Sequence, residues 1–104
     1  GPRLVDLASG AVHRLPAQGV AAVGRRGDCE IVIGSPVVSS RHCILTCSGG
    51  CVEVEDVSSN GTYVNDTAVP KGFSLPQRVA LRDGDQLALG HRRGPTLSFL
   101  VASG

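Results

Sequence analysis

Glycine and proline interrupt this chain every few residues, and this constrains its fold more than any other feature. The 104 residues include 14 Gly and 6 Pro, and no segment keeps a 3.6-residue apolar period for ten positions. Between these breaks lie short apolar runs, several with alternating polarity. The sequence therefore predicts an all-β fold of many short strands joined by turns.

Turn residues set the limits of the expected strands. Glycine-containing turns at residues 8–10 and 48–50 predict hairpins, residues 83–85 predict a further sharp turn, and residues 70–77 a surface loop. About ten short strands in a chain of this length favour a β-sandwich with loops exposed at its ends. The expected strands are 3–7, 11–15, 20–24, 31–33, 42–47, 51–55, 62–64, 68–69, 78–81, 86–89 and 96–102.

Composition limits the number of domains and the class of partner. With 41% hydrophobic residues the chain can bury one core, so we expect a single domain over residues 1–104. Gly1-Pro2 is typical of a tag remnant, and we expect the domain to come from a longer protein. A net charge of +1 gives no reason to expect nucleic acid or an anionic membrane as the main partner. No apolar run approaches the roughly 18 residues of a membrane span, and no signal peptide is recognised.

Four cysteines form an even set, which in a small secreted protein would suggest two disulfides. We instead expect Cys29, Cys43, Cys47 and Cys51 to be small buried hydrophobic residues in a reducing compartment. A zinc site is a weaker alternative, because the spacing lacks a Cys-x-x-Cys pair. We therefore expect neither a metal nor a cofactor.

Three polar clusters follow or precede expected strands. Residues 24–26 read Gly-Arg-Arg, and Arg25 is placed to hold a guanidinium fork over the end of a sheet. Residues 39–42 read Ser-Ser-Arg-His and offer hydroxyls and backbone N–H groups to phosphate oxygens, with His42 bracing two loops. In residues 58–62, Asn-Gly by itself implies a hairpin-like connection, and the Asn carboxamide can pair with both polar groups of a peptide backbone.

The order and spacing of these clusters resemble the forkhead-associated (FHA) domain. Gly-Arg is followed by Ser-x-x-His, by Ser-Ser-Asn-Gly-Thr and by an Asp-Gly-Asp turn, over roughly residues 20–90. The resemblance implies a β-sandwich of two twisted, mainly antiparallel sheets with about eleven strands, an FHA/SMAD-like fold. It also implies a non-enzymatic module that binds phosphothreonine peptides and mediates phosphorylation-dependent protein–protein interaction in signalling.

The resemblance also assigns roles by motif position. Val37 falls near a position that helps select the residue three places after the phosphothreonine, and its apolar side chain predicts an aliphatic residue there rather than Asp. A phosphate of about −1.5 to −2 charge accepts several charge-assisted hydrogen bonds, so binding should depend on phosphorylation. Phosphate contacts are expected from Arg25, Ser39, Ser40 and Ser59, a peptide-backbone contact from Asn60, and structural roles from Gly24, His42 and Gly61.

Three other interpretations compete with this one. An enzyme would use Ser39 or Ser40 as nucleophile and His42 as base, but no orienting acid or Gly-x-Ser-x-Gly elbow accompanies them. In another interpretation, the sandwich binds unmodified partners through a sheet face. A nucleic-acid-binding protein would use Arg25, Arg26, Arg41, Arg92 and Arg93, but the chain has only three aromatic residues, too few for a base-stacking surface.

The expected partner is thus a phosphothreonine-containing protein or peptide, with neither nucleic acid nor membrane involved. We expect the isolated domain to be monomeric. The resemblance implies an intracellular location, in the nucleus rather than the cytoplasm.

Overall fold

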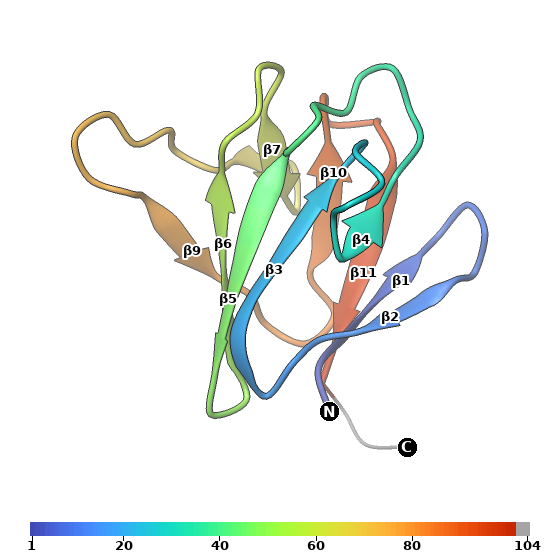
Figure 1. Cartoon of the computed structure of the whole chain (residues 1–104), viewed down its shortest axis with the longest axis vertical. Helices are drawn as coiled ribbons and strands as arrows, with labels where there is room; N and C mark the ends of the chain where they lie inside the picture. Colours follow the sequence, from blue (N-terminus) through green and yellow to red (C-terminus); the bar gives the residue numbers. More distant parts are fainter. Residues whose placement is uncertain (102–104) are drawn as a thin grey trace.

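Two β-sheets packed face to face form the molecule, as the computed structural model shows for residues 1–101 (Figure 1). No helix occurs among these residues, and hence none that could cross a membrane. One sheet has the order β2 (Val12–Arg14), β1 (Arg3–Asp6), β11 (Thr96–Leu100), β10 (Gln86–Leu89), β7 (Thr62–Val64) and β8 (Thr67–Ala68). The other has the order β4 (Ile31–Val32), β3 (Gln18–Gly24), β5 (Cys43–Ser48), β6 (Cys51–Asp56) and β9 (Arg78–Ala80).

Neighbouring strands are antiparallel except for the parallel pair β3 and β4. The predicted all-β sandwich is therefore confirmed. The last strand was expected to reach Ala102, which lies outside the described residues, and β11 itself ends at Leu100.

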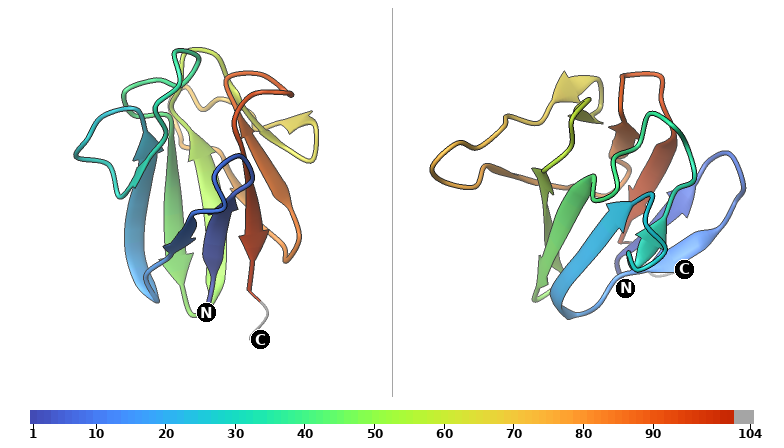
Figure 2. Two further views of the ribbon diagram at one scale, coloured as in Figure 1. Left: turned by 90° about the vertical axis from the view of Figure 1, so that its right-hand side faces the viewer. Right: turned by 45° about the horizontal axis from the view of Figure 1, so that its top comes forward.

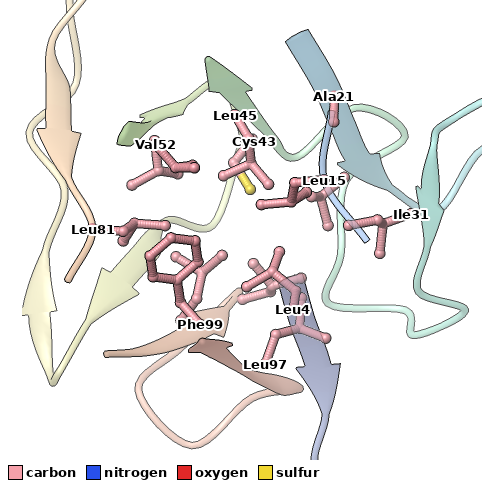
Figure 3. Packing of buried hydrophobic residues seen from close by; sticks show 14 of the residues in the cluster. Leu4, Leu15, Ala21, Ile31, Cys43, Leu45, Val52, Leu81, Leu97 and Phe99 are labelled. Atoms are coloured by element: carbon pink, nitrogen blue, oxygen red, sulfur yellow. The ribbon is translucent and has the colours of Figure 1, made fainter. Parts of the chain in front are cut away.

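The core lies between the sheets and comes from alternate residues of both (Figure 3). Phe99 and Leu4 of the six-stranded sheet face Leu45 and Val52 of the other, and each of the four is at most 1% exposed. Every large apolar side chain buried in this way contributes about 1.5–3 kcal/mol. This packing fixes the strands and leaves their connecting loops at the two ends of the sandwich.

Three turns show how the strands are connected. Gly49 and Gly50 have φ of 57° and 85°, which gives the predicted tight hairpin between β5 and β6. A second tight hairpin, between β7 and β8, was not predicted; it uses Asn65 and Asp66 at φ of 49° and 70°. The hairpin-like connection expected at Asn60-Gly61 is wrong, because β6 and β7 belong to different sheets.

The cysteines are free thiols, and three of the four are buried. Burial raises the pKa of Cys43 far above its usual value and also raises that of Cys47. Cys51 is exposed, which corrects the expectation that all four are buried: it shares the outward face of β6 with Glu53, since side chains alternate along a strand. Among residues 1–101, no group of three His, Cys, Asp or Glu side chains is placed to hold a metal ion.

Candidate functional site

Four loops meet at one end of the sandwich: those after β3, before β5, after β6 and after β10 (Figure 2). The first two are joined through their backbones. The Arg25 N–H donates to the Ser39 carbonyl at 3.0 Å and the Arg26 N–H to the Ser40 carbonyl at 3.2 Å. At Gly24 a Cβ would collide with the Ser40 carbonyl oxygen. Glycine at this position therefore permits the close approach of the two loops.

His42 connects the loop before β5 with the loop after β6. Its fully buried ring accepts the Ser39 N–H at Nδ1 (3.0 Å), so Nε2 carries the hydrogen and donates to the Gly61 carbonyl at 2.7 Å. Burial lowers the pKa of His42, although the bond to Gly61 and the nearby Asp56 charge oppose this effect. A neutral imidazole thus holds the two loops, and neither nitrogen is available to a serine hydroxyl.

A buried carboxylate that the sequence interpretation missed shapes the loop after β6. Asp56 Oδ1 accepts hydrogen bonds from Ser58 N (3.0 Å), Ser58 Oγ (2.5 Å) and Thr62 Oγ1 (2.9 Å), while Oδ2 accepts from Lys71 Nζ at 2.6 Å. Ser58 Oγ in turn accepts the Gly61 N–H at 2.7 Å. Burial by itself would raise the pKa of Asp56, but the bonds from Lys71, Ser58 and Thr62 outweigh it and lower the pKa.

The sequence contained a signal for this network. Asp56 lies on the same face of β6 as Val52 and Val54, because side chains alternate along a strand. Its carboxylate therefore points inward, where a buried charge needs hydrogen-bond donors. Ser58, two residues later, can supply the donors of an Asx-type turn.

On the solvent side of these loops, some polar groups keep hydrogen-bonding capacity that the protein itself does not use. Ser39 Oγ accepts the Ser59 N–H at 3.0 Å, so its own hydrogen points elsewhere, and Asn60 Nδ2 donates to the Val37 carbonyl at 3.2 Å. Within residues 1–101 the Arg25 guanidinium has no hydrogen-bond or ion-pair partner. The neighbouring Arg26, by contrast, pairs with Asp28 at 2.8 Å.

These groups surround one shallow hollow of about 280 Å³. It contains the six expected contact residues, whereas Gly24, His42 and Gly61 lie behind it and join the loops. Arg41, Arg92 and Arg93 do not line it, and Arg92 instead lies over the Tyr63 ring at 4.9 Å. The lining is Arg25, Pro36, Val37, Val38, Ser39, Ser40, Ser59 and Asn60.

The chemistry of this hollow suits an anion carried on a polypeptide. A guanidinium and several hydroxyl groups can surround a group that has only acceptor oxygens, whereas the Ser39 and Ser59 N–H groups are already used within the chain. The free oxygen and second N–H of the Asn60 carboxamide can pair with the backbone on either side of such a group.

Comparison with known proteins points to one family. The family model for the FHA domain matches residues 22–90. The chain is 35% identical over 91 residues to a probable serine/threonine-protein kinase, fhkA, of Dictyostelium discoideum, covering 78% of this chain and 15% of the kinase. It thus spans a small part of that relative.

Two solved structures share the fold closely. EmbR of Mycobacterium tuberculosis, in complex with a low-affinity phosphopeptide, superposes with a TM-score of 0.82 at 28% identity, over 99% of this chain and 25% of EmbR. A domain solved in work on phosphothreonine-dependent FHA domain interactions gives 0.82 at 28% identity, over 99% of this chain and 98% of that one.

Proposed function

Since the chain belongs to the FHA domain family, we propose that it binds phosphothreonine-containing peptides and so mediates phosphorylation-dependent protein–protein interaction in signalling. One observation carries this proposal: Arg25, Ser39 and Asn60, from three loops far apart in the sequence, line a single hollow. The similar EmbR structure with a phosphopeptide, and the similar domain from work on phosphothreonine-dependent interactions, support it.

Each side chain in the hollow has a proposed role. The unpaired Arg25 guanidinium forms charge-assisted hydrogen bonds with the phosphate, at about 1.5–3 kcal/mol net for each bond. The Ser39 hydroxyl donates to a phosphate oxygen, because its acceptor side is already used by the Ser59 N–H. Ser40 and Ser59, both exposed at the rim, supply further hydroxyl contacts.

Asn60 is proposed to hold the peptide chain beside the phosphate. Its bond to the Val37 carbonyl fixes the carboxamide plane and leaves the oxygen and one N–H for the peptide backbone. Because this contact involves only the peptide backbone, it positions the peptide without selecting any of its side chains.

Val37 is proposed to influence which peptides bind. A Cβ on Gly90 would lie 2.9 Å from Val37 Cβ, so Gly90 allows Val37 to pack closely against the end of β10. The half-buried apolar side chain lines the hollow. We propose that it favours an aliphatic residue over Asp three places after the phosphothreonine.

The remaining proposals concern the protein as a whole. We propose that residues 1–104 are one monomeric binding domain of a longer intracellular protein, acting in the nucleus rather than the cytoplasm, and that it has no catalytic activity, cofactor or metal. The small share of fhkA that the chain covers supports the longer protein. The net charge of +1 argues against nucleic acid or membrane as partner.

A comparison of two adjacent arginines tests the proposed function. A degenerate phosphothreonine peptide library should be retained by the wild type and by Arg26→Ala, but not by Arg25→Ala. Arg26 is a matched control because it follows Arg25 directly in the same turn but is paired with Asp28. Phosphatase treatment of the library should abolish retention by the wild type. Retention that survives phosphatase, or that Arg25→Ala leaves intact, would refute the proposal.

A further inference from the structure

A second hollow lies on the other side of the loop that carries Ser59 and Asn60. Its volume is about 420 Å³, compared with about 280 Å³ for the phosphate-site hollow. One wall is residues 55–58 and the other is residues 71–76 of the loop between β8 and β9. In Figures 1 and 2 the loop after β6 rises between the loop before β5 and the loop that leads to β9.

The walls of this second hollow expose large apolar side chains to solvent. Val57, Phe73 and Leu75 are 45%, 101% and 72% exposed, and they are three of the seven large apolar residues that the described chain leaves exposed. Single exposed apolar residues are ordinary, but three around one hollow form a surface suited to an apolar ligand group. Phe73 in particular makes its ring fully available for contact.

The charges in the same hollow are already compensated within the chain. Asp56 is bound by Lys71, and Glu55 lies 3.8 Å from the Arg78 guanidinium. A charged ligand group would have to compete with these pairs. The hollow therefore favours an apolar side chain over an ionic one.

The two walls are also held together. Lys71 Nζ donates to Asp56 Oδ2 at 2.6 Å and to the Ser58 carbonyl at 2.5 Å, which joins the outer loop to the loop that carries Ser59 and Asn60. This link fixes the position of the apolar wall relative to the phosphate site, so less ordering is needed when a ligand binds.

Ser58 lines the second hollow and Ser59 lines the phosphate site, so the two hollows are separated by a single peptide unit. A peptide that leaves the phosphate site over Ser59 must pass the second hollow. We infer that this hollow receives an apolar side chain of the same phosphothreonine peptide, outside the positions read by Val37 and Asn60. The inference rests on the proposed function, and it makes Phe73, Leu75 and Val57 determinants of peptide selection.

A phosphothreonine peptide library with five degenerate positions on each side tests this inference, since five extended residues reach about 16 Å. The wild type should enrich aliphatic or aromatic residues at one position other than the third place after the phosphothreonine, which is assigned to Val37. The double variant Phe73→Ser/Leu75→Ser should lose this enrichment and bind the best selected peptide roughly tenfold more weakly. Its dependence on the phosphate should remain.

The control removes two other exposed apolar side chains, far from the second hollow. Leu7 and Val12, 53% and 54% exposed near the β1–β2 hairpin, line none of the hollows described above. Leu7→Ser/Val12→Ser should therefore select the same peptides as the wild type. If Phe73→Ser/Leu75→Ser keeps the wild-type selection, the inference is wrong while phosphothreonine binding stands. If the wild type retains no phosphopeptide, both the inference and the proposed function fail.

Discussion

At the scale of single residues, the environment of His42 fixes both its protonation state and its tautomer. Its buried ring accepts one backbone N–H and donates to one backbone carbonyl, and this arrangement requires the neutral imidazole. Protonation would place a hydrogen on Nδ1 opposite the Ser39 N–H, so two donors would face each other. Charging His42 should therefore loosen the loop that presents Ser39.

This environment predicts how the stability of the domain depends on pH. The pKa of His42 is lowered from its ordinary value of 6.5, so just below pH 6.5 the unfolded chain binds more protons than the folded one. The stabilisation from His42 is complete above pH 6.5 and is lost as the pH falls through its lowered pKa, at no more than about 1.4 kcal/mol per pH unit. Urea unfolding at pH 7.5 and 5.5 measures the loss.

A substitution shows whether His42 is the group responsible. His42→Gln should be less stable than the wild type at both pH values, but its stability should change less between them. His91→Gln, on an exposed loop, is the control and should keep the wild-type pH dependence. Equal pH dependence in His42→Gln and the wild type would rule out this role for His42.

The residues proposed to contact the phosphopeptide could be named from the sequence, but the Asp56 network behind them could not. The order of Arg25, Ser39 and Asn60 is a family pattern and can be recognised without coordinates. Asp56 directly follows the expected strand 51–55, and its role was missed because its partners Thr62 and Lys71 are six and fifteen residues away and meet it only in the folded chain. The local indications were its position on the inward face of β6 after Val54 and the nearby Ser58.

At the scale of the elements, the end of β3 positions the site. Gly24 ends the strand directly beneath the Ser40 carbonyl, and the two hydrogen bonds from Arg25 and Arg26 continue the contact into the turn. The β3 end and the loop before β5 are therefore joined by close packing and two backbone hydrogen bonds.

Alanine substitutions at Gly24 and Gly27 should distinguish the effect of lost close packing from the effect of lost backbone freedom. In Gly24→Ala the new Cβ would push the Ser40 carbonyl away, which we expect to cost about 1–3 kcal/mol and to weaken phosphopeptide binding. Gly27→Ala is the matched control in the same turn, since nothing lies within 4 Å of its added Cβ. Thermal unfolding and peptide titration check both variants. Wild-type behaviour in Gly24→Ala would show that the close approach is unimportant.

Strand positions were foreseeable because alternation and turn residues are local signals. The expected strands at 62–64 and 86–89 coincide with β7 and β10, while β3 begins at Gln18 rather than at residue 20. Gln18 and Gly19 join the strand because they pair with Ser48 and Cys47, a contact between distant segments. The crossing of the chain between sheets at Gly61 was likewise invisible locally, since Asn-Gly is equally typical of a hairpin.

At the scale of the whole molecule, the two sheets act as a rigid frame for loops at one end. Arg25 and Asn60 are separated by 34 further residues in the sequence, yet they line the same hollow because both follow strands of the five-stranded sheet that end at this rim. Hydrogen bonds of the Ser39 backbone and hydroxyl, the His42 ring and the Gly61 carbonyl then join the loops. Ligand binding should therefore be confined to this end of the sandwich.

The most direct test of the account is to map binding on the 15N-labelled domain by NMR. Titration with a phosphothreonine peptide selected from the library should shift the amides of Arg25, Ser39, Ser40, Ser59 and Asn60 most strongly. The same peptide without phosphate should leave them unchanged at equal concentration. Equal shifts with both peptides, or shifts centred on Val20, Ile44 and Glu53 of the outer sheet face, would contradict the account.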